Sequence, residues 1–115
     1  MRPFNLKEYL NDPSRKIVTR EGGEARIIRM DADDSPYPIH ASVDMGMYVD
    51  ISFYTTEGKR FGNEHESPYD LFFVPQKTEV GEYLKYLYTK IIFRIKNKKV
   101  KSFCYENLRN THIKF

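Results

Sequence analysis

Short segments of alternating apolar and polar residues occupy the chain between residues 16 and 74. Residues 16–20 and 24–30 flank the pair Gly22-Gly23. Glycine readily adopts the positive backbone angles that a tight hairpin needs. The sequence therefore predicts a first β-hairpin at this position.

Further strands are predicted downstream. Apolar residues at positions 39, 41 and 43 alternate with polar ones, which is the period of a half-buried strand. Residues 48–55 place Val49, Ile51 and Phe53 on one face, and we expect this strand to be central in the sheet. Residues 70–74 form the last of the series. Short sequential strands favour an antiparallel meander, curled or closed into a small barrel.

A short helix is predicted near the N-terminus. Asn5 can cap a helix that starts at Leu6, with Glu8 reaching back to the cap, and Asn11-Asp12-Pro13 ends it. Together with the strands, this helix gives a fold of the α+β class that is mainly antiparallel β.

The segment 82–96 is compatible with either a helix or a strand. Leu84, Leu87, Ile91 and Ile95 have helical spacing, but Tyr, Thr, Ile and Phe crowd the segment and prefer strands. We favour the strand, followed by a hairpin turn at Asn97-Lys98.

Composition limits the size and setting of the protein. A chain of 115 residues with 40% hydrophobic content can bury one core, so we expect a single compact domain over residues 1–115. The mean hydropathy of −0.65 and the lack of an apolar run of about 20 residues argue against a membrane protein. The first residues do not resemble a signal peptide, and the single Cys104 cannot form an internal disulfide. We therefore expect a cytoplasmic protein.

Charge divides the chain into two segments. Residues 1–75, the predicted meander, carry 9 Lys/Arg and 13 Asp/Glu, whereas residues 76–115 carry 10 Lys/Arg and 3 Asp/Glu. In the second segment, which we expect to pack on the first, cations alternate with aromatic residues. This pairing suits nucleic acids, because cations neutralise phosphates and rings stack on bases. The candidate contacts are Lys85, Lys90, Arg94, Lys96, Lys98, Lys99, Lys101, Tyr86 and Tyr88.

Another interpretation of these cations is structural, because lysines commonly protect an exposed sheet edge from aggregation while aromatic residues pack inward. The sequence shows no catalytic constellation: His40, His65 and His112 stand far apart, and Cys104 has no activating motif beside it. We therefore predict a protein that is not an enzyme and that uses no cofactor or metal.

Several short motifs in roughly residues 1–80 resemble a group of small uncharacterised proteins from prophages and mobile elements of gut bacteria. The resemblance implies no activity and no functional residue. The leading hypothesis is a small interaction or accessory module whose sheet face or edge binds a protein partner or a second copy. The alternative is a nucleic-acid-binding module that uses the basic segment. The motifs are Pro3-Phe4-Asn5-Leu6, Ile17-Val18-Thr19-Arg20-Glu21-Gly22, Ala25-Arg26-Ile27-Ile28, Tyr37-Pro38-Ile39, Tyr54-Thr55-Thr56-Glu57-Gly58-Lys59 and Asp70-Leu71-Phe72-Phe73.

Overall fold

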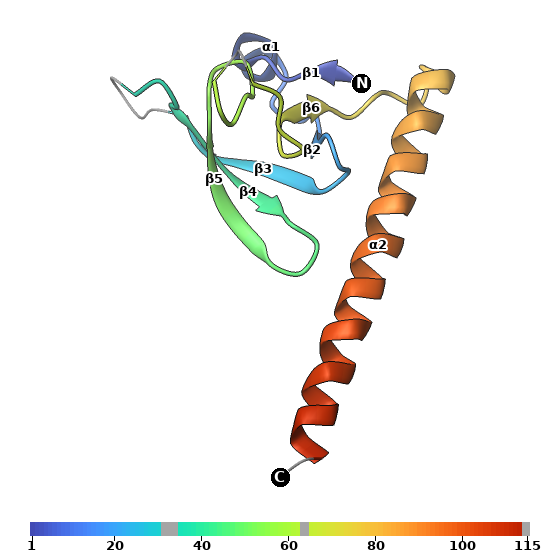
Figure 1. The fold of residues 1–115 in the computed structure, drawn as a ribbon. Coiled ribbons are helices and arrows are strands. Elements are labelled where there is room, and N and C mark those ends of the chain that lie inside the picture. The colour runs from blue at the N-terminus through green and yellow to red at the C-terminus, as the bar shows by residue number, and fades with distance from the viewer. Residues whose placement is uncertain (31–34, 63–64, 114–115) are drawn as a thin grey trace.

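The computed structural model describes residues 1–30, 35–62 and 65–113, with side chains up to residue 98. It contains one antiparallel sheet, a short helix and a long C-terminal helix (Figure 1). In chain order the elements are β1 (Arg2–Pro3), α1 (Leu6–Asn11), β2 (Ile17–Thr19), β3 (Glu24–Arg29), β4 (Ile39–Asp44), β5 (Val49–Tyr54), β6 (Leu71–Phe73) and α2 (Val80–Ile113).

The six strands are ordered β1-β6-β2-β3-β4-β5, and every neighbouring pair is antiparallel. The prediction of a mainly antiparallel sheet is confirmed, but the sheet formed by the described residues is open, so closure into a barrel is wrong. The reason lies in β6, which pairs with β2 through Phe72 and Val18 rather than with β5. That pairing leaves β5 at the edge of the sheet, not at its centre as we expected.

The main core lies on one face of the sheet. In β4, Ile39, Ala41 and Val43 are buried while the residues between them are partly exposed, as the alternation predicts. Helix α1 packs against this core through Leu6 and Tyr9. The buried members of the core are Phe4, Ile17, Ala25, Ile39, Ala41, Val43, Tyr54, Leu71 and Phe73.

Helix α1 begins where the sequence predicts. The Asn5 side-chain oxygen accepts a hydrogen bond from the Glu8 amide at 3.2 Å, which caps the helix. The Glu8 carboxylate does not complete the reciprocal bond, because it forms ion pairs with Arg2 and Arg15 instead.

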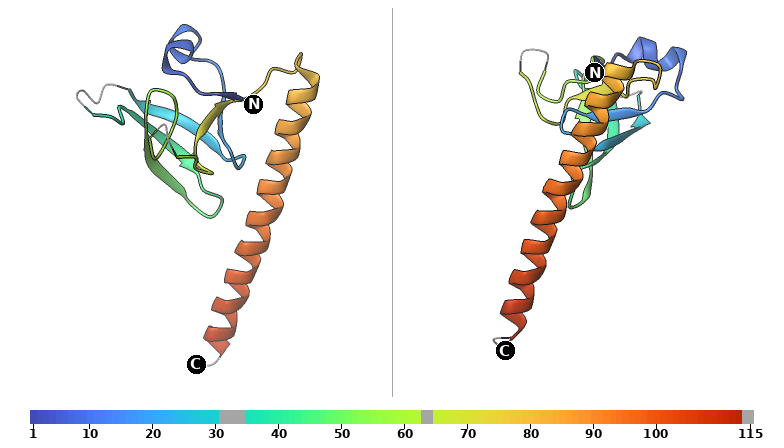
Figure 2. Two further views of the ribbon diagram at one scale, coloured as in Figure 1. Left: turned by 45° about the horizontal axis from the view of Figure 1, so that its top comes forward. Right: turned by 90° about the vertical axis from the view of Figure 1, so that its right-hand side faces the viewer.

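Residues 82–96 belong to α2, so the strand and its turn at Asn97-Lys98 are wrong predictions. Helical spacing places Tyr86 and Phe93 on one side of α2, where both are buried, and this packing outweighs the strand preference of the individual residues. Helix α2 crosses the sheet and continues beyond it (Figure 2). Its 34 residues span about 51 Å. Within the described residues, no helix combines the length and apolar character needed to cross a membrane.

Candidate interaction surfaces

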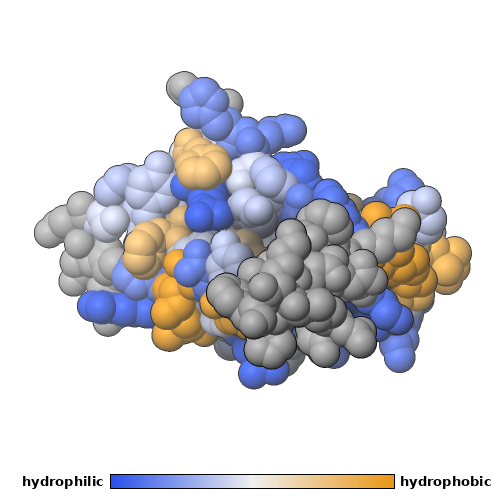
Figure 3. Space-filling view, turned by 60° about the horizontal axis from the view of Figure 1, so that its bottom comes forward, coloured by the Kyte–Doolittle hydropathy of each residue, from blue (hydrophilic) through white to orange (hydrophobic). Residues whose placement is uncertain are grey.

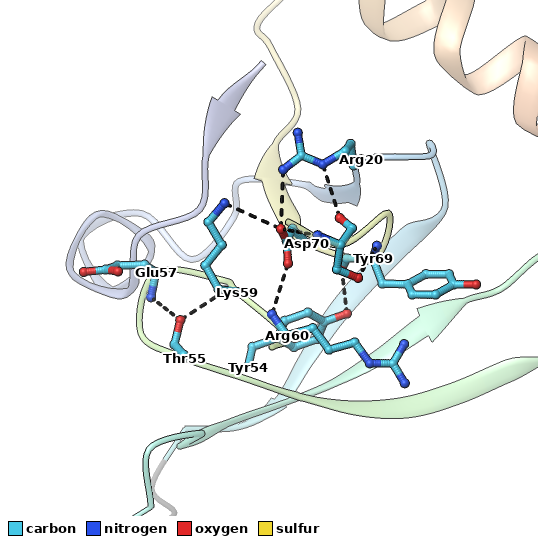
Figure 4. Close-up of polar contacts among 9 residues, drawn as sticks. Arg20, Tyr54, Thr55, Glu57, Lys59, Arg60, Tyr69 and Asp70 are labelled. Atoms are coloured by element: carbon cyan, nitrogen blue, oxygen red, sulfur yellow. Dashed lines mark hydrogen bonds and ion pairs between the residues drawn. The ribbon is translucent and has the colours of Figure 1, made fainter. Parts of the chain in front are cut away.

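A buried carboxylate in the loop before β6 binds Arg20, the residue that follows β2 (Figure 4). Asp70 is 1% exposed, and its oxygens accept hydrogen bonds from the Ser67 amide at 2.9 Å and the Arg60 amide at 3.0 Å. The Arg20 guanidinium lies 3.4 Å away and the Lys59 ammonium 3.5 Å away. Four protein donors therefore surround this carboxylate, which makes it a structural lock rather than a reactive acid.

Tyr54 belongs to the same region. Its hydroxyl donates a hydrogen bond to the Tyr69 carbonyl at 2.8 Å, and burial raises the pKa of Tyr54 to about 12. The phenol therefore stays protonated at neutral pH and anchors the loop. Sequence reasoning missed this cluster, because Arg20 and Asp70 are separated by 50 residues.

Among the side chains that the structure describes, the predicted nucleic-acid contacts do not gather on one face of α2. At 3.6 residues per turn, Lys85 and Lys96 lie on one side of the helix and Lys90 and Arg94 on another. Lys98 is exposed at the end of the part whose side chains are described. The side chains of Lys99 and Lys101 lie outside the described residues.

The two predicted stacking rings occupy opposite environments. Tyr88 is 68% exposed, but Tyr86 is only 6% exposed and packs against Val18 and Phe72 of the sheet. The Lys90 Nζ atom lies 5.8 Å from the centroid of the Tyr86 ring. Tyr86 is therefore a docking residue of the helix rather than a platform for a base.

The residues around Tyr86 line a groove of about 440 Å³ between α2 and the segment that leads into β2. Its walls carry positive charge from Arg15, Lys16, Lys77 and Lys90 and negative charge from Asp12. The groove thus brings two of the predicted contacts, Lys90 and Tyr86, close to cations that precede β2.

Two glycine-containing turns let α2 approach the sheet closely. A Cβ atom on Gly22 would lie 3.0 Å from the Thr89 carbonyl oxygen, and one on Gly46 would meet the Asn97 side chain. Phe93 also packs at the first of these turns. We call this side of α2, defined by Tyr83, Tyr86, Phe93 and Asn97, the docked face.

The opposite side of α2 carries a second apolar row, the outward stripe. Its members, Leu84, Tyr88, Ile91 and Ile95, are spaced by four, three and four residues and are 49–68% exposed. This spacing is that of the a and d positions of a heptad, which place side chains on one seam. Lys85 holds an e position on one side of the seam, and Arg94 holds a g position on the other side.

The sheet also exposes apolar side chains. Val49, Ile51 and Phe53 of β5, which we call the β5 row, point away from the core and are 52–67% exposed. The Phe53 ring contacts the His40 ring of β4 with 4.5 Å between centroids. In Figure 3, hydrophobic surface gathers in two separate places, over the sheet and at the margin formed by α2.

Among the described residues, no three His, Cys, Asp or Glu side chains come close enough together to hold a metal ion. Comparisons of the chain with protein-family models, with curated proteins and with solved structures found no match.

Proposed function

We propose that this chain is a non-catalytic protein-interaction module of mobile-element type that binds its partner through the outward stripe of α2. The observation that carries the proposal is the second apolar row, which remains exposed although the opposite side of the same helix is already docked on the sheet. A helix of a single globular domain normally needs only one such stripe.

The outward stripe matches the anchors of a helix that binds in a groove. Such helices insert side chains at positions i, i+3 or i+4, and i+7, and Leu84, Tyr88 and Ile91 satisfy this spacing. Fully burying one large apolar side chain contributes roughly 1.5–3 kcal/mol. Because the four residues are about half exposed, the partner can gain on the order of 3–6 kcal/mol from them.

That apolar gain is too small for tight binding, since a micromolar complex requires about 8 kcal/mol. Charge at the sides of the stripe can supply the difference and select the partner. Between residues 80 and 98 the only acidic residue is Glu82, whereas Lys85 and Arg94 flank the stripe. Two copies of α2 would set cation beside cation. The favoured partner is therefore a protein with an apolar groove rimmed by carboxylates.

A direct test uses a defined probe for this chemistry. A labelled acidic helical peptide, with leucine at its a and d positions and glutamate at e and g, is titrated with the protein by fluorescence anisotropy. Ile91→Ser should weaken binding at least tenfold, and the matched control Ile28→Ser, at an exposed isoleucine of β3, should leave it unchanged. Equal affinity for both variants would refute the role of the stripe.

The nucleic-acid alternative is tested in the same format. Labelled single-stranded DNA, duplex DNA and RNA are titrated across a salt series with the wild type and a Lys96/Lys98/Lys99/Lys101→Ala variant. Micromolar binding that falls steeply with salt and disappears in the variant would support the alternative over the protein-interaction role. The split of the cations around α2 and the burial of Tyr86 favour the opposite result.

A further inference from the structure

The β5 edge offers a second interaction surface, independent of α2. Within the described residues, β5 is the last strand of the sheet. The Ile51 amide donates to the Asp50 side-chain oxygen at 2.9 Å instead of to a strand. Because backbone groups alternate in direction along a strand, the N–H and C=O groups of Val49, Ile51 and Phe53 point out of the sheet. The edge thus presents three residues ready for strand pairing.

The side chains of the same three residues form the β5 row, and the apolar surface is only one strand wide. Their partners across β4 are Asp44, Ser42 and His40, which are all polar. A partner lying flat on this face would therefore cover polar groups together with the row. A strand added at the edge would instead place its own side chains directly beside the row.

A second copy of β5 fits this edge in one register better than in its neighbours. In an antiparallel pair centred on Ile51, Val49 of one chain faces Phe53 of the other, and Ile51 faces itself. The three residue pairs can exchange six backbone hydrogen bonds, and every outward pair is apolar. A pair centred one residue earlier would oppose two Asp50 carboxylates, which is unfavourable.

We propose that two copies of this chain pair antiparallel through β5, with Ile51 on the two-fold axis, and so join their sheets. The Asp50 side chain competes for the Ile51 amide in the single copy and is displaced on pairing. Asp50 therefore keeps the association reversible, in the way that charged residues protect other sheet edges.

Sedimentation velocity over a concentration series up to about 1 mM tests the proposal. We expect a monomer–dimer equilibrium that Ile51→Lys weakens at least tenfold, because it opposes two lysines on the axis. Asp50→Ala should strengthen pairing severalfold. The matched control Leu10→Lys, which places a lysine at an exposed apolar residue of α1, should have no effect.

Cross-linking checks the register. In a Cys104→Ser background, Ile51→Cys should form a disulfide-linked dimer under mild oxidation, because paired Cα atoms about 5.5 Å apart lie within disulfide range. A protein that stays monomeric at every concentration would overturn the proposal. So would a dimer that Ile51→Lys leaves intact, or one that is lost only in Ile91→Lys, since the latter would place the contact on α2.

Discussion

Among the residues that the structure describes, removing the Asp70 carboxylate should destabilise the fold more than any other loss of a single charge. In Asp70→Ala, the buried amide of Ser67 and the partly buried amide of Arg60 lose their acceptor, and an unsatisfied buried donor costs about 1–3 kcal/mol. Arg20 and Lys59 are 38% and 24% exposed at their side chains, so water partly compensates for their lost ion pairs. The expected loss in the free energy of unfolding is about 4 kcal/mol.

That magnitude is a large share of the total stability of a small domain, and it corresponds to a fall in Tm of about 20 °C. Urea unfolding should be followed by near-UV circular dichroism of the tyrosines, because α2 dominates the far-UV signal. Asp70→Asn keeps the size and one oxygen acceptor, so we expect it to lose about half as much as Asp70→Ala.

The matched control is Glu57→Ala, which removes an exposed carboxylate from the neighbouring turn. It should change the free energy of unfolding by less than about 0.5 kcal/mol. If Asp70→Ala and Glu57→Ala were equally mild, the view of Asp70 as a structural lock would be wrong.

Two further predictions concern tyrosines. Tyr86→Ala should cost about 3 kcal/mol and increase hydrogen exchange of the α2 amides, because the ring holds the helix on the sheet, whereas Tyr88→Ala should change neither by a measurable amount. Equal effects of the two variants would show that Tyr86 does not hold the helix on the sheet. Tyr54, whose pKa is raised from 10.0 to about 12, keeps its full contribution to stability below pH 10 and loses it as the pH rises through 12. The free energy of unfolding should therefore fall by about 2–3 kcal/mol over this window in urea titrations. A wild type whose slope matches that of Tyr54→Phe would contradict this expectation.

The strands could be predicted because their signals are local. The alternation in β4 and the glycine turn before β3 each depend on a few consecutive residues, and both appear as expected. The order of the strands could not be predicted, because the pairing of β6 with β2 depends on packing between distant parts of the chain. The apolar residues of β5 suggested a central strand, and the structure exposes them at an edge.

The candidate sites were predicted only in part. The cations of α2 were visible in the sequence, but the strand assignment for residues 82–96 put their neighbours on the wrong faces. Helical spacing separates Tyr86 from Tyr88 by two residues, about 200° around the helix, so one ring docks and the other is exposed. The Asp70 cluster had no local signal, since its donors come from three separate segments.

The docking site of α2 on the sheet limits the order in which the chain can fold. Val18 of β2 and Phe72 of β6 form this docking site, the seat of the helix, together with Tyr86. The two residues pair with each other although their strands are far apart in the sequence. Among the paired strands of the sheet, only β1 and β6 are farther apart. The meander from β3 to β5 needs only short loops, whereas β6 must close a loop of more than 50 residues before the seat exists. We therefore expect α2 to dock only after β6 has paired with β2, so the outward stripe reaches its final position once the sheet is complete.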